Sequence, residues 1–132
     1  LFNDARTIAD LHTIIHAHRA HGTTGLLATL ITDAPARLAE QVALIADAIE
    51  TDPLCRHALL GIHLEGPFFN PARCGAHPRD LLLLPDTAWL QRWITAGRGQ
   101  LKIVTLAPEL PGALDVIRLG VAHGMRMALG HS

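Results

Sequence analysis

Four short apolar runs, each preceded by a helix-like segment, constrain the fold of this 132-residue chain more than any other feature. Helices are expected over residues 7–21, 33–50, 86–97 and 112–124, and strands over 24–31, 58–64, 101–107 and 125–129. The runs are apolar throughout rather than alternating, which is typical of parallel strands that are covered on both faces. The order of elements therefore predicts an α/β fold with a parallel sheet.

Cap and turn residues support these boundaries. Asp33 is expected to cap the helix that begins near Pro35, because a capping acid and an early Pro both favour helix starts. Asp86 is expected to cap the third helix, and Gly97 to end it. A loop with Pro and Gly, residues 66–85, follows the second strand, and loops of that length are usually functional or disordered.

A sheet of this kind fits two architectures, an open doubly wound sheet and a (β/α)8 barrel. A whole barrel needs about 250 residues, roughly twice this chain. The pattern alone does not separate an open sheet from half of a barrel. No G-x-G-x-x-G follows the first strand, which disfavours dinucleotide binding. In both architectures ligands meet the carboxyl ends of the strands.

Composition excludes several functional classes. The net charge is −1 and the sequence has no basic block, so nucleic acid is not an expected partner. No run reaches the roughly 18 apolar residues that a membrane span requires. The first residues show neither the basic head nor the apolar stretch of a signal peptide. With only two cysteines and no disulfide framework, a cytoplasmic location is expected.

Polar side chains follow three of the four strands. The second strand ends at Glu65, the third is followed by Glu109, and the fourth by His131. Parallel strands bring these positions to one rim, where a Glu and a His are suitable ligands for zinc or iron. Taken alone, Glu65 could be a solvated carboxylate and His131 a core histidine. Burial of Glu65 behind Gly66 would be costly without a cation or a proton.

The other candidate residues have weaker indications. His63 shares a strand face with Glu65, and it is expected to pack beside the ligands or to support them rather than to bind metal. Glu109 is undecided between capping the following helix and catalysis. The histidines at 12, 16, 18 and 21 lack the H-E-x-x-H spacing and are expected to line a solvated helix face. Cys74, beside Arg73, has no evident catalytic context.

Several segments of the sequence resemble a known family, the N-acetylglucosamine-6-phosphate deacetylases of the amidohydrolase superfamily. The segments are GIHLEGPFFNPARCGAHP (61–78), VTLAPE (104–109), ALGHS (128–132) and HGTTGLLATLITD (21–33). They cover essentially the whole chain in order, and the first is the most specific. The resemblance implies a partial (β/α)8 TIM barrel, with the four strands as about its second to fifth.

The resemblance also implies roles for single residues. Glu65 and His131 would be ligands of a divalent metal, zinc or alternatively iron, and Ala76 and His77 would contact a phosphorylated amino sugar. The family hydrolyses the N-acetyl group of N-acetylglucosamine 6-phosphate. Cys74 departs from the family, which usually has a basic residue before Gly-x-His.

The same resemblance implies that residues 1–132 are one part of a single catalytic barrel domain. The first strand, the later strands, a small β domain, one further His ligand and the proton-transferring Asp are expected outside this segment, the Asp beyond residue 132. No catalytic acid or base is therefore expected within it, and the segment alone should be inactive. The full-length protein is expected to be a homo-oligomer.

Two alternatives remain open on the residues alone. One is another amidohydrolase, such as a deaminase or a cyclic-amide hydrolase. The other is a non-catalytic α/β module that binds a metabolite and holds no stoichiometric metal.

Overall fold

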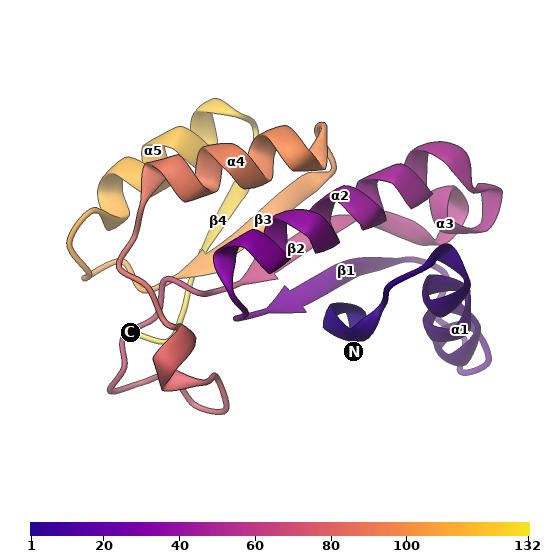
Figure 1. Ribbon diagram of the computed structural model, residues 1–132, viewed down its shortest axis with the longest axis horizontal. Coiled ribbons are helices and arrows are strands. Elements are labelled where there is room, and N and C mark those ends of the chain that lie inside the picture. Colours follow the sequence, from indigo (N-terminus) through magenta and orange to yellow (C-terminus); the bar gives the residue numbers. More distant parts are fainter.

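The computed structural model describes residues 1–132 and contains one sheet of four parallel strands in the order β1-β2-β3-β4 (Figure 1). The strands span Leu26–Ile31 (β1), Leu59–Glu65 (β2), Leu101–Leu106 (β3) and Arg126–Leu129 (β4). This confirms the expected α/β fold. A doubly wound sheet reverses its strand order at a switch point, whereas a barrel adds each strand beside the last. The sequential order is therefore that of a barrel segment.

The chain also contains five α-helices and two short 3-10 helices, of which one of each precedes β1 and the others connect the strands. The α-helices span Ile8–Arg19 (α1), Pro35–Thr51 (α2), Pro53–Ala58 (α3), Thr87–Gly97 (α4) and Ala113–Ala122 (α5), and the 3-10 helices span Phe2–Asp4 (η1) and Arg79–Leu81 (η2). The pattern did not predict α3. Asp52 and Pro53 directly follow α2, where they suggest only that α2 ends. In the structure the Asp52 side chain caps a new helix by accepting a hydrogen bond from Cys55 N–H. None of these helices is both long and apolar enough to cross a membrane.

The core lies between the sheet and the helices α2, α4 and α5, which run along one of its faces (Figure 1). Alternate strand residues point into this layer and are fully buried, among them Leu30, Leu64 and Val104. The other face carries Thr29, His63, Glu65 and Thr105, which are only partly buried. The expectation that both faces are covered is therefore wrong for this chain. Its second face is the one that would line the inside of a barrel.

Two of the expected helix boundaries differ in detail. Asp33 does not cap α2, because Ala34 occupies the cap position, and Asp33 pairs instead with Arg37 at 3.1 Å. The left-handed residue after α4 is Arg98, with φ 46°, rather than Gly97. Gly97 is the last helical residue, where a Cβ would lie 3.3 Å from side chains of Val42 and Leu101. Close packing, and not a turn, accounts for that glycine.

The two ends of the sheet carry different structures. The long loop after β2 and the segment after β4 lie together at the carboxyl ends of the strands, while α1 and α3 lie at the amino ends (Figure 1). In the loop, Phe68 O accepts from Ala107 N–H, and Pro67 O accepts from Leu83 N–H. The loop is therefore tied to the end of β3 and to its own return segment.

Candidate metal centre

Glu65, His77 and His131 come together at the carboxyl end of the sheet, with one possible ligand atom of each within 4.8 Å of the others. Glu65 Oε1 lies 3.4 Å from His131 Nε2 and 3.9 Å from His77 Nε2. Ligands held about 2.1 Å from a tetrahedral cation are separated by about 3.4 Å. The spacing and the chemistry of these three side chains therefore fit a divalent metal such as zinc.

Glu65 is the last residue of β2, and its partly exposed side chain projects from the face opposite the core. Gly66 follows with φ 90°, a conformation that favours glycine, and a Cβ there would collide with the Thr32 hydroxyl. The chain can therefore turn away directly after the carboxylate. This turn leaves Glu65 at the rim instead of continuing the strand.

His131 lies just beyond β4 in a left-handed conformation, with φ 55°. The loop holds this residue by three contacts. Asn70 N–H donates to His131 O at 3.1 Å, the Phe69 ring stacks on the imidazole at 4.0 Å, and His131 Nδ1 lies 3.1 Å from Arg73 O. Because a carbonyl can only accept, Nδ1 carries the proton. Nε2 is therefore the ring nitrogen that faces Glu65 Oε1, at 3.4 Å.

His77 is buried beneath the same loop. Its Nδ1 lies 2.8 Å from Thr32 Oγ1, and the Thr32 hydroxyl donates to Glu65 O at 3.4 Å. Burial lowers the pKa of His77; Glu65 opposes that shift and His131 adds to it. The ring is therefore held neutral, with Nδ1 donating to Thr32 and the Nε2 lone pair available on the side of Glu65.

His63 lies one pleat below Glu65 on the same strand face. Its Nδ1 lies 3.2 Å from Thr29 Oγ1 and its Nε2 2.8 Å from Thr105 Oγ1, so both ring nitrogens are engaged. Burial lowers the pKa of His63, and Glu65 partly opposes this shift. His63 is therefore a neutral imidazole that links β2 to β1 and β3, and it lies beneath Glu65 on the same face of the sheet.

The remaining loop residues surround the cluster. Ala76 is exposed beside His77, and Cys74 is buried. Glu109 does not cap α5, whose cap is Gly112, and instead accepts a hydrogen bond from Asn70 Nδ2 at 2.8 Å. Asn70 therefore joins the loop to both neighbouring strand ends, through Glu109 after β3 and through His131 after β4.

Sequence reasoning missed two residues of this arrangement. Thr32 follows β1 directly, so the strand-end rule that singled out Glu65 would also have found it. The role of Asn70 has no comparable signal, because its partners are 39 and 61 positions away and no spacing rule links them.

The histidines of the first helix divide into two kinds. His16 and His18 on α1, and His21 after it, are exposed as expected. His12 is not part of a solvated face, because its Nε2 lies 2.9 Å from Asp52 Oδ1 at the start of α3. That pairing lies at the amino end of the sheet, away from Glu65.

Parallel strands in sequential order, helices on one face and a Glu/His group at the strands' carboxyl ends define a class of protein. They are typical of metal-dependent hydrolases built on a (β/α)8 barrel.

Comparisons with known proteins identify the family within this class. No family model matches the chain. The chain is 37% identical to the N-acetylglucosamine-6-phosphate deacetylase of Vibrio furnissii over 92% of its own length and 30% of that protein. It is 35% identical to the N-acetylgalactosamine-6-phosphate deacetylase of Shewanella sp. (strain ANA-3), over all of its own length and 32% of the relative.

A solved structure gives the same result. A mutant N-acetyl-D-glucosamine-6-phosphate deacetylase from Mycobacterium smegmatis, in complex with N-acetyl-D-glucosamine-6-phosphate, superposes with a TM-score of 0.89 at 39% identity. The match covers 98% of this chain and 32% of that one. The chain is thus homologous to the N-acetylglucosamine-6-phosphate deacetylases and spans about a third of their length, which confirms the family resemblance.

Proposed function

We propose that the protein containing this chain hydrolyses the N-acetyl group of N-acetylglucosamine 6-phosphate, giving glucosamine 6-phosphate and acetate. The observation that carries the proposal is the approach of Glu65 Oε1 to His131 Nε2, at 3.4 Å, in a chain homologous to such deacetylases. These two side chains lie 66 positions apart in the sequence and meet only at the carboxyl ends of parallel strands. That is the rim where barrel enzymes bind their substrates.

Glu65 and His131 are the proposed ligands of one divalent cation, zinc, with iron as the alternative. The donor set supports this assignment, because a carboxylate and an imidazole with its Nδ1 proton fixed by Arg73 O are ordinary ligands of these metals. When bound, the cation supplies Lewis acidity toward the amide carbonyl and the attacking water. His63 is proposed to support Glu65 from below by filling the sheet face beneath it.

Ala76 and His77 are proposed to contact the amino sugar. Thr32 fixes the His77 proton on Nδ1, so Nε2 can accept a hydrogen bond from the substrate. His77 also lies near enough to Glu65 to be a third ligand of the cation. The variant His77→Asn separates the two roles. Loss of a substrate contact raises KM with the metal content unchanged, whereas loss of a ligand lowers the metal content.

An assay of the complete protein tests the proposal. Purified protein should release acetate from N-acetylglucosamine 6-phosphate, should contain stoichiometric metal, and should lose both properties in the double variant Glu65→Gln/His131→Asn. Absence of metal would favour the non-catalytic module. Activity confined to cyclic amides or to deamination substrates would favour another amidohydrolase.

A second candidate substrate is N-acetylgalactosamine 6-phosphate. Two relatives are named N-acetylgalactosamine-6-phosphate deacetylase, and they are 35% and 43% identical to this chain over the matched parts. These identities are similar to those of the relatives named for N-acetylglucosamine 6-phosphate. The two sugars are epimers with the same amide and phosphate. Comparing kcat/KM for both epimers, and for the sugars without phosphate, therefore identifies the substrate.

Three further properties belong to the same proposal. Residues 1–132 form part of a single catalytic barrel domain whose other strands and proton-transferring Asp lie outside this segment. The complete protein is a homo-oligomer, which light scattering on the purified protein tests. It works in the cytoplasm, in keeping with its two free cysteines.

A further inference from the structure

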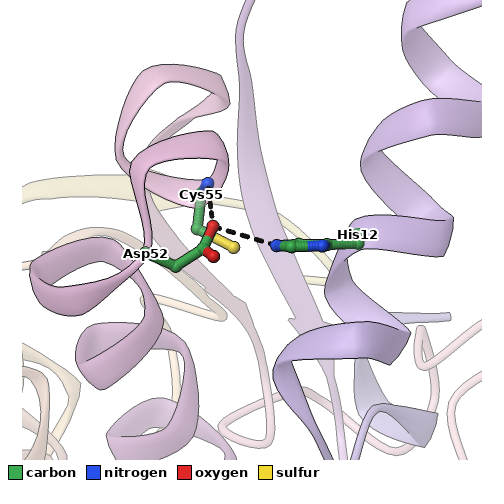
Figure 2. Close-up of side chains that lie close together, drawn as sticks. All are labelled: His12, Asp52 and Cys55. Carbon is green, nitrogen blue, oxygen red and sulfur yellow. Dashed lines mark hydrogen bonds and ion pairs between the residues drawn. The ribbon is translucent and has the colours of Figure 1, made fainter.

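A second group of ligand-type side chains lies at the amino end of the sheet, at the opposite rim from Glu65. His12 comes from α1, and Asp52 and Cys55 come from the start of α3 (Figure 2). One nitrogen, oxygen or sulfur atom of each lies within 4.8 Å of the others. Nothing in the proposed deacetylation uses these residues.

Asp52 connects the other two side chains. Its Oδ1 accepts from Cys55 N–H at 2.8 Å and lies 2.9 Å from His12 Nε2. Figure 2 shows the carboxylate and the Cys55 sulfur side by side, facing the edge of the His12 ring. Helix capping explains the bond to the backbone, but it explains neither the sulfur nor the imidazole at the same carboxylate.

The surroundings of Cys55 exclude the other chemistry of a thiol. Cys55 lies buried beside the Asp52 carboxylate, and these surroundings disfavour the free thiolate that nucleophilic chemistry requires. Cys55 is fully buried, and the other cysteine, Cys74, lies in the loop at the opposite end of the sheet. A disulfide between them is therefore excluded. Coordination of a cation remains, because a cation replaces the thiol proton directly.

We propose that His12, Asp52 and Cys55 form a second metal site, for zinc, that fastens α1 to α3. Imidazole, carboxylate and thiolate together favour zinc over magnesium or calcium, which prefer all-oxygen ligands. On binding, the Cys55 S–H bond breaks and its proton passes to solvent, while the sulfur electron pair forms the bond to zinc. The His12 proton that faces Asp52 leaves Nε2 and is replaced, through solvent, by a proton on Nδ1, so that the Nε2 lone pair can bind zinc. His12 and Asp52 are partly exposed, at 35% and 19%, so the cation can enter between them.

The role of this site is structural. It joins residue 12 to residues 52 and 55, which lie 40 and 43 positions away in the chain. Solvent completes the coordination at the exposed side. In barrel enzymes the active site lies at the carboxyl end of the strands, whereas the amino end contributes to stability.

Cobalt(II) titration of the complete protein tests the site, with the double variant Glu65→Gln/His131→Asn as background to remove the first centre. We expect a near-ultraviolet thiolate-to-cobalt charge-transfer band. Cys55→Ser should abolish the band, and the matched control Cys74→Ser should keep it. Absence of the band, or its persistence in Cys55→Ser, would overturn the proposal.

A second variant guards against a folding defect in Cys55→Ser. His12 lies at the surface, so His12→Ala should leave the circular dichroism spectrum unchanged while it weakens zinc binding by more than about tenfold. Unaltered zinc affinity in His12→Ala would show that the three side chains form only a hydrogen-bonded cap. Neither result depends on whether the protein is a deacetylase.

Discussion

The two rims of the sheet hold similar side chains in different ways. At the carboxyl end, Glu65, His77 and His131 lie on a strand end and in loops. At the amino end, His12 and Cys55 lie within helices, and Asp52 caps one of them. Side chains on helices keep their positions through the regular backbone. Those at the carboxyl end are positioned by a loop that must itself be held in place.

The backbone at the carboxyl rim shows the cost of this arrangement. His131 is in a left-handed conformation, which is disfavoured by about 1–2 kcal/mol for a residue other than glycine. Hydrogen bonds to Asn70 N–H and Arg73 O hold it there. The carboxyl rim therefore depends on a loop that holds a disfavoured backbone conformation, whereas the amino rim joins two regular helices through one long-range contact, that of His12 with Asp52.

The largest expected loss of activity comes from substitution of Glu65, the carboxylate that both His77 and His131 approach at the carboxyl rim. Glu65→Gln removes the charge that faces His77 and His131, so bound metal should be lost and kcat/KM for deacetylation should fall by at least about 100-fold. Elemental analysis and an acetate-release assay measure both effects. Glu40→Gln, an exposed carboxylate on α2, is the matched control and should behave as wild type. Full activity in Glu65→Gln would contradict the proposal that the carboxyl rim holds the catalytic metal.

The next effect tests whether Thr32 orients His77. Thr32→Val keeps the side-chain shape but leaves the buried His77 Nδ1–H without a partner, at a cost of about 1–3 kcal/mol. We expect kcat/KM to fall by about tenfold with no change in metal content. Thr32→Ser should restore activity, because it returns the hydroxyl. If Thr32→Val and wild type have equal kinetics, His77 is oriented by other contacts.

A smaller effect is expected from the link between the loop and β3. Asn70→Ala removes the hydrogen bond to Glu109 but keeps the backbone N–H that donates to His131 O. Since the side-chain bond is exposed and worth about 0.5–1.5 kcal/mol, kcat/KM should fall only severalfold. Glu109→Gln keeps an acceptor oxygen and should lose less than Glu109→Ala. Equal losses in both Glu109 variants would exclude the hydrogen bond as the cause.

The smallest expected effect concerns the amino rim, where Asp52 makes the stability of the protein depend on pH. Backbone and His12 hydrogen bonds lower the pKa of Asp52 to about 2, from an ordinary value of about 3.9. Because the folded-state pKa is depressed, its stabilising contribution is present above about pH 4 and is lost as the pH falls toward 2. Acid unfolding of the metal-free protein should therefore be shallower in this window for Asp52→Asn. Denaturant titrations at several pH values measure the slope, and parallel curves would contradict the assignment.

The elements themselves could be predicted from local patterns. Apolar runs, the Asp86 cap and the early Pro35 placed the strands and the long helices within a few residues. The short helix α3 was missed because its cap and its Pro directly follow α2, with no apolar period of its own. The burial of one sheet face only was also missed, since half-buried Thr29 and Thr105 lie among apolar neighbours.

The sequence by itself determined that parallel strands carry Glu65 and His131 at their carboxyl ends, because parallel pairing brings every such end to one rim. Only the tertiary structure decided which partners orient them. The contacts of His77 with Thr32, of Glu109 with Asn70 and of His12 with Asp52 join residues about 40 or more positions apart. Side-chain hydrogen bonds across such separations depend on packing and register, which no local periodicity encodes.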